Sequence, residues 1–355
     1  MRLERLRERM VEHKLDSMLI TDPLNRRYLS GFSGSAGWLL VTAERAMLVV
    51  DFRYYARAER ESPDWEQIRV TGTYLEALAE TVTETGITQL GIEGDHVSVA
   101  QFDEMRSKVP DVTFVPLEKM ILPMRAIKDE GEIEAIRAAV ACSDAAFVHL
   151  CQVIRPGMTE AEVGWELESY VRLHGASAVS FPFIVGSGPN GAMPHATCSE
   201  RVIQEGEPIV LDFGAVVQGY CSDVTRTVCL GKADGRYERI WQLVLEAQRS
   251  AEEQLRPGMS GQEADAIARD MFAQAGYADQ FGHGLGHGLG LAVHEAPRLS
   301  RLADDVILKP GMVFTVEPGL YFPDWGGVRI EDIVVMREDS VEVLTGAVKE
   351  RVIAM

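Results

Sequence analysis

The stretch Arg155-Pro156-Gly157-Met158-Thr159 decides the fold, because it recurs later in the chain as Arg256-Pro257-Gly258-Met259-Ser260. Apolar residues at helical spacing precede the first copy, and Pro156-Gly157 is typical of the end of such a helix. These apolar residues are Ile133, Ile136, Val140, Phe147, Leu150 and Ile154. Each copy is therefore expected to follow a long helix.

Each copy also opens a second helix with the same capping pattern. Thr159 is followed by Glu162, and Ser260 by Glu263, at the spacing of a capping box. A glycine then ends each second helix at a matched position. These glycines are Gly175 and Gly276. Pro-Gly followed by a capping residue is common between helices. Several positions of the two copies match at one constant offset, however, and this favours two related halves. We expect the halves to pack about a pseudo-twofold axis, with an active site between them.

Two domains are expected, because 355 residues exceed the usual size of a single domain. Apolar runs of strand length alternate with helical patterns in the first part of the chain, as in an α/β domain. The strand-like runs are Ser17 to Ile20, Trp38 to Val41, Ala46 to Val50 and Leu90 to Ile92. A strong helix start follows Leu122-Pro123-Met124-Arg125. The predicted fold class is α/β (α+β), with domains at residues 1–122 and 123–355.

Composition argues against two classes of partner. The formal net charge is −19, whereas binding to nucleic acid needs a basic surface. No run reaches the ~18 apolar residues of a membrane span, and the N-terminus lacks the apolar stretch of a secretory signal. The five cysteines are scattered, without Cys-x-x-Cys spacing, which favours reduced thiols in a cytoplasmic protein.

Two acids flank a predicted hairpin in the first half. Asp212 ends an apolar run, and Asp223 opens a β-branched run. If the hairpin turns directly after Val217, the two acids lie directly opposite each other. Their Cβ atoms would then be about 5 Å apart on one face of the sheet. Two carboxylates this close repel, so we expect a positive group between them.

The same arrangement occurs in the second half. The run Val313-Phe314-Thr315-Val316-Glu317 ends in an acid, and Val328-Arg329-Ile330-Glu331-Asp332 is expected to pair with it. Glu317 and Glu331 are symmetric about Asp324, so a hairpin centred there would make them a cross-strand pair. Two such hairpins predict four carboxylates around a cation site.

A nitrogen ligand is expected from the glycine-rich segment between Phe281 and Glu295. This segment holds three histidines, His283, His287 and His294. Glycines beside a histidine allow backbone and substrate to approach closely. The segment lacks the His-Glu-x-x-His spacing of helix-borne zinc sites, so metal binding here requires another architecture.

Four carboxylates and one imidazole form an oxygen-rich ligand set without thiolates. Such a set suits Mn²⁺, Co²⁺, Fe²⁺ or Zn²⁺, and four negative charges balance two divalent ions. Two ions roughly 3.5 Å apart can share a water molecule and bring its pKa near neutrality. The sequence therefore predicts a dinuclear metal centre with hydrolytic chemistry.

The chain resembles the pita-bread-fold metallopeptidases, which include methionine aminopeptidase, Xaa-Pro aminopeptidase and Xaa-Pro dipeptidase (prolidase). The match lies in the type, order and approximate spacing of five residues: Asp212, Asp223, His287, Glu317 and Glu331. It spans about Arg125 to the C-terminus and fits the internal repeat. The stretch Tyr28-Leu29-Ser30-Gly31-Phe32-Ser33-Gly34-Ser35 is similar to the N-terminal, creatinase-like domain of the Xaa-Pro members.

The resemblance implies a role for each of the five residues. Asp212 would chelate one metal ion, and Asp223 and Glu331 would bridge two. His287 and Glu317 would complete the second ion, and Glu317 would also handle the proton of the attacking water. The resemblance thus implies two divalent ions per subunit, Mn, Co or Zn, with Mn favoured.

The resemblance also implies residues that bind substrate. His294 corresponds to a histidine that stabilises the oxyanion, and His195 to one that contacts substrate near the scissile nitrogen. His283 corresponds to a further active-site histidine of the prolidase-like members. Arg298 resembles an arginine that binds the free carboxylate of a dipeptide. Arg329 lies two residues before a predicted bridging carboxylate and is expected to support it from behind.

The expected reaction is hydrolysis of the bond between an N-terminal residue and a following proline in small peptides, by a homodimer. Aminopeptidase and dipeptidase share these motifs, and the choice depends on how far the N-terminal domain, of this or a neighbouring subunit, closes the site. One alternative is a methionine aminopeptidase-like enzyme, although such enzymes usually lack so large an N-terminal domain. A creatinase-like hydrolase should have lost metal ligands, and none is lost here. A non-catalytic pita-bread protein-binding module is the alternative from another class.

Overall fold

The computed structural model describes residues 2–354, which form two compact units. The first unit runs to Arg125 and the second begins at Ala126, within helix α6 (Leu122–Ala126). The boundary predicted between residues 122 and 123 lies in the first turn of this helix. Every predicted site residue belongs to the second unit.

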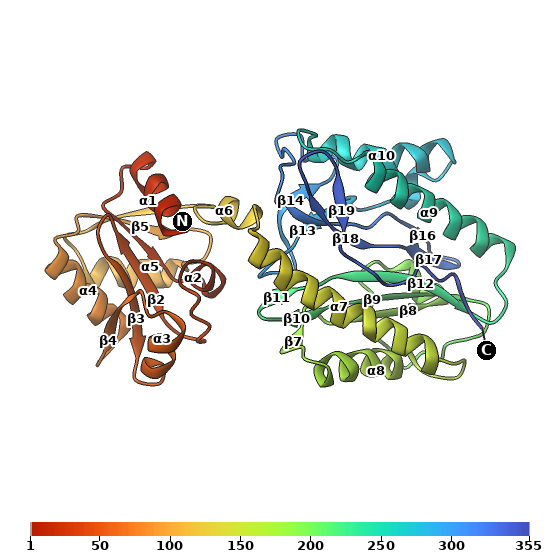
Figure 1. Cartoon of the computed structure of the whole chain (residues 1–355), viewed down its shortest axis with the longest axis horizontal. Coiled ribbons are helices and arrows are strands. Elements are labelled where there is room, and N and C mark those ends of the chain that lie inside the picture. Colours follow the sequence, from red (N-terminus) through yellow and green to blue (C-terminus); the bar gives the residue numbers. More distant parts are fainter. Residues whose placement is uncertain (1, 355) are drawn as a thin grey trace. The chain divides into compact units, whose positions relative to one another are not determined.

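The first unit is built around one mixed six-stranded sheet (Figure 1). Its order is β4 (Glu66–Val70), β3 (Ala46–Asp51), β2 (Trp38–Thr42), β1 (Ser17–Ile20), β5 (Gln89–Glu93) and β6 (Thr113–Leu117). Its helices are α1 (Arg2–Glu12), α2 (Pro23–Ser30), α3 (Tyr55–Glu61), α4 (Tyr74–Thr85) and α5 (Val99–Lys108). The four predicted strands are confirmed as β1, β2, β3 and β5. The two strands that were not predicted, β4 and β6, are the edges of the sheet, where polar side chains face water and the apolar pattern is weak.

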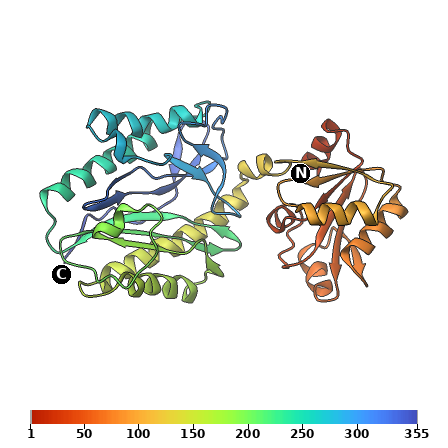
Figure 2. The ribbon, with the colours of Figure 1, turned by 180° about the vertical axis from the view of Figure 1, so that it is seen from behind.

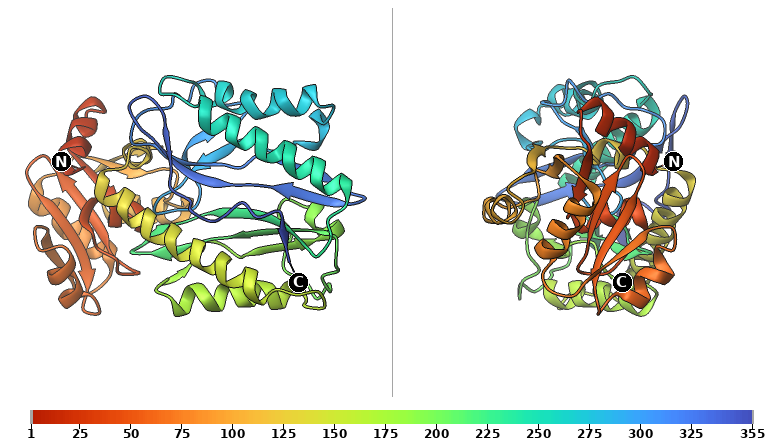
Figure 3. Two further views of the ribbon diagram at one scale, coloured as in Figure 1. Left: turned by 45° about the vertical axis from the view of Figure 1, so that its right-hand side comes forward. Right: turned by 90° about the vertical axis from the view of Figure 1, so that its left-hand side faces the viewer.

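Two pairs of helices flank the strands of the second unit (Figures 1 and 2). The pairs are α7 (Glu130–Val153) with α8 (Glu160–Leu173), and α9 (Gly235–Gln254) with α10 (Gly261–Gln274). One pair lies on each side of the strands, as the turned view in Figure 3 also shows. Two short 3-10 helices, η1 (Gly188–Ala192) and η2 (Ala278–Gln280), lie in the connections.

The strands between these helices form two main sheets. The first has the order β20 (Val352–Ile353), β12 (Val224–Leu230), β9 (Pro208–Phe213) and β8 (Ile184–Ser187). The second has the order β14 (Glu295–Leu299), β13 (Gly286–Gly288), β15 (Val313–Val316), β18 (Asp332–Met336) and β19 (Val341–Val343). Two smaller sheets extend the hairpins: β11 (Tyr220–Cys221), β10 (Ala215–Val217) and β7 (Ala178–Val179), and the pair β16 (Gly319–Phe322) and β17 (Gly326–Arg329).

The internal repeat corresponds to matched backbone hydrogen bonds in the two halves. The N–H of Gly157 donates to Ile203 O at 3.0 Å, and that of Gly258 donates to Leu308 O at 2.9 Å. Both predicted capping boxes are present, and both helix-ending glycines have positive φ. Each half also has its own apolar core, under α7 and α8 in the first half and under α9 and α10 in the second. Two related halves, inferred from the repeat, are therefore confirmed.

Helix α7 corrects one expectation about membrane spans. Among the described helices it is long and apolar enough, by length and composition, to cross a membrane. Its apolar positions are nevertheless the ones the helical spacing predicted to face a core, and Ile136, Phe147 and Leu150 are fully buried. The core helix of a globular unit passes the same test of length and hydropathy, because one of its faces is continuously apolar.

Candidate metal centre and active site

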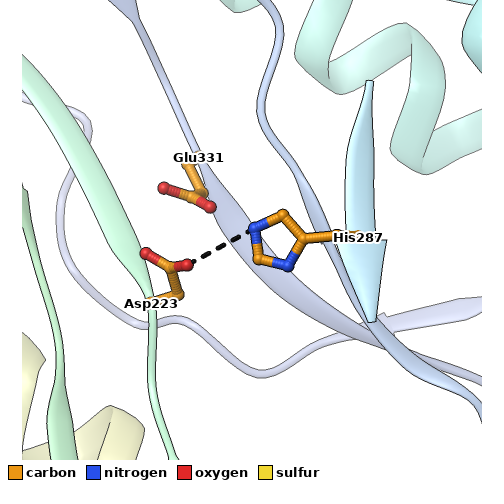
Figure 4. Close-up of side chains that lie close together, drawn as sticks. All are labelled: Asp223, His287 and Glu331. Atoms are coloured by element: carbon orange, nitrogen blue, oxygen red, sulfur yellow. Dashed lines mark ion pairs between the residues drawn. The ribbon is translucent and has the colours of Figure 1, made fainter. Parts of the chain in front are cut away.

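A cleft of about 760 Å³ opens in the second unit, and all ten predicted site residues line it. They are His195, Asp212, Asp223, His283, His287, His294, Arg298, Glu317, Arg329 and Glu331. In Figure 4 the side chains of Asp223, His287 and Glu331 point toward one another from three separate segments. One ligand atom from each of these three residues lies within 4.8 Å of the other two.

The first pair of acids is offset by two residues from the predicted register. Asp212, in β9, pairs with Thr225 of β12, and Asp223 lies diagonally across on the same face. The reason is the turn, which is centred on Gln218-Gly219 because Val217 pairs with Tyr220. Both turn residues have positive φ, at 52° and 83°, as a two-residue type I′ turn requires. The prediction of directly opposite acids was therefore wrong, although their common face was right.

The second pair of acids keeps the predicted register but interrupts the strands. Val316 pairs with Asp332, and Gly319 pairs with Arg329, so Glu317 and Glu331 fall at matched positions between the two ladders. The acids thus lie at the breaks between β15 and β16 and between β17 and β18. At such a break the side chains need not alternate between the two faces of the sheet, so Glu317 and Glu331 can both turn toward the centre of the cleft.

His287 is delivered by the central residue of the three-residue strand β13. Glycines on both sides allow this strand to lie close to its neighbours: a Cβ at Gly286 would be 1.9 Å from Thr315 O, and one at Gly288 would be 2.1 Å from Ala296 O. Nδ1 of His287 donates to Gly288 O at 3.1 Å, which leaves the lone pair of Nε2 facing the acids. Nε2 lies 3.6 Å from an oxygen of Asp223 and 3.4 Å from one of Glu317.

The acids are crowded and poorly solvated. Asp223 is 5 % exposed and Glu331 is 2 % exposed. Burial, together with the charges of the neighbouring carboxylates, raises the pKa of both groups well above their usual values. Burial also raises the pKa of Glu317 and lowers that of His287. Such shifts mean that the ionised acids lack a positive partner of sufficient charge.

Divalent metal ions fit this arrangement. Asp212 has one buried carboxylate oxygen, Oδ1, without a hydrogen-bond partner, and buried acceptors are normally satisfied. Glu331 accepts a hydrogen bond from Thr225 Oγ1 at 2.6 Å, and Glu317 accepts one from Thr315 Oγ1 at 3.2 Å, so both are oriented from behind. An oxygen-rich set with one imidazole and an unsatisfied oxygen matches the chemistry of hard divalent ions.

Arg329 supports a different acid from the one expected. Its Nη2 donates to Asp212, the predicted terminal chelator, rather than to a bridging acid. It reaches Glu331 only through Thr225, whose Oγ1 accepts from Arg329 Nε at 3.0 Å and donates to Glu331. The reason is the diagonal register, which places Thr225 between these side chains. Its role in orienting a carboxylate from behind stays a prediction.

Tyr321 is a site residue that the sequence did not single out. Its hydroxyl accepts from Arg329 Nη1 at 2.9 Å and lies 3.0 Å from Nε2 of His283. Nδ1 of His283 lies 2.7 Å from Gly284 O, so both ring nitrogens have partners within the protein. His283 therefore lines the cleft as part of a hydrogen-bond chain that leads to Asp212. The hairpin register alone could have indicated Tyr321, because it lies two positions from Gly319, the partner of Arg329.

The remaining predicted residues lie at the mouth of the cleft. His294 is exposed, and its ring centroid is 4.3 Å from that of His287. Partial burial of its ring, followed by the nearby His287 and His195, lowers the pKa of His294, which favours its neutral form. Arg298, in β14, is also exposed and lies opposite His287 in the pairing of β13 with β14. These positions suit contacts with a substrate that enters from solvent.

A cleft floored by acids and one imidazole, between two related halves, defines a metal-dependent hydrolase. The comparisons identify its family. The model of Metallopeptidase family M24 matches residues 134–338, and that of the Creatinase/Prolidase N-terminal domain matches residues 2–127. The chain belongs to metallopeptidase family M24, and the resemblance to pita-bread metallopeptidases is confirmed.

Several relatives match over the whole chain. A Xaa-Pro dipeptidase of Pyrococcus horikoshii is 37% identical over 351 residues, which cover 98% of each chain. A solved Xaa-Pro dipeptidase from Bacillus anthracis has a TM-score of 0.97 at 40% identity and covers 100% of this chain and 99% of that one. A solved X-Pro aminopeptidase from Thermotoga maritima has a TM-score of 0.94 at 37% identity, with 100% of both chains covered. The similarity to the dipeptidase and aminopeptidase structures is thus nearly equal.

Proposed function

We propose that this metallopeptidase removes an N-terminal residue that is followed by proline, using two divalent metal ions. The observation that carries the proposal is that four carboxylates and His287 line one cleft, with Asp223, Glu331 and Glu317 close to His287. Relatives named for Xaa-Pro cleavage, which match nearly the whole chain, support the proline specificity.

The residues that would hold the ions are the five predicted ligands. In this assignment, which follows the family resemblance, Asp212 would help to hold one ion, His287 and Glu317 would help to hold the other, and Asp223 and Glu331 would serve both. When bound, the ions would polarise the scissile carbonyl and lower the pKa of a water molecule to near neutrality. Manganese is the ion that we propose, because the set is oxygen-rich and contains no thiolate.

The chain's own side chains then handle protons and position the substrate. Glu317 lines the cleft and is oriented by Thr315 Oγ1, so it is placed to accept the proton of the attacking water and to return it to the leaving nitrogen. His294, at the mouth and beside His287, donates a hydrogen bond from its neutral ring to the developing oxyanion. His195 faces the same space and contacts the substrate near the scissile nitrogen.

Arg298 favours a dipeptide as the preferred substrate. It lines the cleft with an exposed guanidinium group, whose planar fork matches the free carboxylate of a dipeptide. Partly exposed apolar side chains that line the same cleft, including Phe181 and Val293, offer a surface for a proline ring. In a longer peptide the carboxylate would lie further away, and this ion pair would be lost.

We also propose a cellular location and an oligomeric state for this protein. The five cysteines are all free thiols, which supports a cytoplasmic setting. A homodimer is the assembly that we propose from the family resemblance, and light scattering of the purified chain would test it.

The proposal is tested by assaying the Mn²⁺-loaded chain on Ala-Pro, Ala-Pro-Ala-Ala and, as the control, Ala-Ala. We expect Ala-Pro to be cleaved fastest and Ala-Ala slowest. Cleavage of Ala-Pro-Ala-Ala at a higher kcat/KM than Ala-Pro would make the protein an aminopeptidase and remove the role of Arg298. If the metal-loaded chain cleaved neither proline peptide, the proposed function would be wrong.

A further inference from the structure

A buried ion pair lies directly beneath the loop that carries His294. Lys128 Nζ is 3.6 Å from Glu295 Oε2, and the two side chains are only 1% and 2% exposed. Removing two such charges from water costs several kcal/mol per ion, and their attraction often does no more than offset that cost. Stability alone is therefore a weak reason for placing this pair beside the active site.

Glu295 shapes the loop that joins β13 to β14. Its Oε1 accepts a hydrogen bond from the N–H of Ala292 at 2.8 Å, which folds the loop back on itself. Gly290 lets the charged groups fit underneath, since a Cβ there would be 3.0 Å from Glu295 Oε2 and 3.1 Å from Lys128 Cε. His294 is the residue immediately before Glu295, so its backbone is fixed by the same contacts.

The loop is also joined to the segment that carries Asp223. The N–H of Cys221, two residues before Asp223, donates to Gly290 O at 2.7 Å. The loop is therefore held on one side by the first half of the repeat and on the other side by Lys128. A shift of this loop would move His294 relative to both His287 and Asp223.

Lys128 is itself a rigid support. Its N–H donates to Gly311 O at 2.8 Å, and the preceding residue, Ile127, forms a β-bridge with Met312. The following residue, Asp129, caps helix α7. The backbone of Lys128 is thus fixed against both β15 and α7, so its side chain can hold Glu295 in one place.

We propose that Lys128 is a positioning residue: through Glu295 it fixes the loop that sets the direction of His294. Lys128 lies beneath the loop and acts through Glu295 without touching the substrate. This role rests on the proposed function of His294 in catalysis, and it is separate from metal binding, because neither Lys128 nor Glu295 belongs to the ligand set.

Two measurements on the full-length, Mn²⁺-loaded chain test the proposal. The first compares kcat and KM of wild type, Lys128→Met, Lys128→Arg and Lys349→Met on Ala-Pro. The matched control, Lys349→Met, removes a lysine that pairs with Asp332 on the far side of β18. We expect Lys128→Met to lower kcat about 10–100-fold, with KM changed less than about threefold and two ions retained. Lys128→Arg should recover part of kcat. Lys349→Met should lower the Tm without a fall in kcat at nearly constant KM.

The second measurement is amide hydrogen exchange of the peptide that covers residues 289–295. In Lys128→Met we expect this peptide to exchange at least about tenfold faster, with no such change in Lys349→Met. This readout does not depend on turnover, so it remains decisive if the wild type cleaves no proline peptide. Unchanged exchange in Lys128→Met, an unchanged kcat in a protein that is active, or loss of metal with the loss of kcat would each overturn the proposal.

Discussion

Two clusters of buried charge lie on opposite sides of one short segment. Glu331 belongs to the cluster on the cleft side, and Asp332 belongs to the cluster on the far side. On the cleft side, burial and the neighbouring acids raise the pKa of Glu331 well above its usual value. On the far side, the charges of Arg226 and Lys349 outweigh burial and lower the pKa of Asp332. Two consecutive residues, the second of which begins β18, thus experience opposite electrostatic environments.

The difference lies in where the positive charge comes from. Asp332 has a cation for each oxygen, with Arg226 Nη2 at 2.7 Å and Lys349 Nζ at 2.6 Å. Arg226 also donates to the main-chain oxygen of Glu331 at 2.6 Å, which fastens β12 to β18. The cleft side has four acids, and one arginine, Arg329, contacts them. A buried acid whose cation is built into the chain is structural, whereas acids without one require a cation from solution.

The largest effect should come from removing an acid on the cleft side. Asp223→Ala or Glu331→Ala would take away a ligand that we propose both ions share, so we expect kcat/KM to fall by more than the about 10–100-fold typical of outer-shell changes. Metal analysis should show one or both ions lost. The exposed Glu338→Ala serves as the control and should retain both ions. Two fully occupied sites in Glu331→Ala would refute its place in the ligand set.

His294→Ala should separate chemistry from metal binding on the same side. Because His294 lies outside the ligand set, both ions should stay while kcat falls about 10²–10³-fold, as when an oxyanion donor is lost. Steady-state kinetics with metal analysis measures both quantities. An unchanged kcat would remove the oxyanion role.

Arg329→Met tests the arginine that donates to the cleft-side acid Asp212. Asp212 would lose its ion pair and its orientation, so we expect a loss of about 10–100-fold in metal affinity or activity. Arg329→Lys keeps the positive charge but lacks the planar guanidinium group, so its metal affinity and activity should lie between those of Arg329→Met and wild type. Equal metal affinity in all three proteins would show that Arg329 does not support the site.

The smallest effect on catalysis is expected on the far side, at Glu252. Burial, then the charge of Asp332, raises its pKa from 4.5 to about 8. A raised pKa means that the stability from the protonated form is complete below pH 4.5 and is lost as pH rises through about 8. Glu252→Gln should therefore resist unfolding better than wild type at pH 8.5, by on the order of a few kcal/mol, and equally near pH 4.5. Urea unfolding at the two pH values checks this. If wild type and Glu252→Gln lost equal stability between pH 4.5 and pH 8.5, the raised pKa of Glu252 would be wrong. A changed kcat in the variant would show that the far-side cluster and the cleft-side cluster are not independent.

The sequence predicted local features of this site better than its cross-strand ones. Caps, paired helices and the hairpin around Asp324 depend on neighbouring residues and were confirmed. The pairing of Asp212 with Thr225 depends on where the turn is centred, which is one residue later than predicted. The residue types around the turn do not fix that position. Tyr321 and the Lys128–Glu295 pair were missed for a similar reason, because contacts between distant segments leave no periodic pattern in the chain.

The central claim is that the cleft-side acids hold two divalent ions. Equilibrium dialysis of the purified chain against Mn²⁺, followed by measurement of metal per chain, tests it most directly. We predict two ions per wild-type chain. One ion or none at saturating Mn²⁺ would contradict the dinuclear centre.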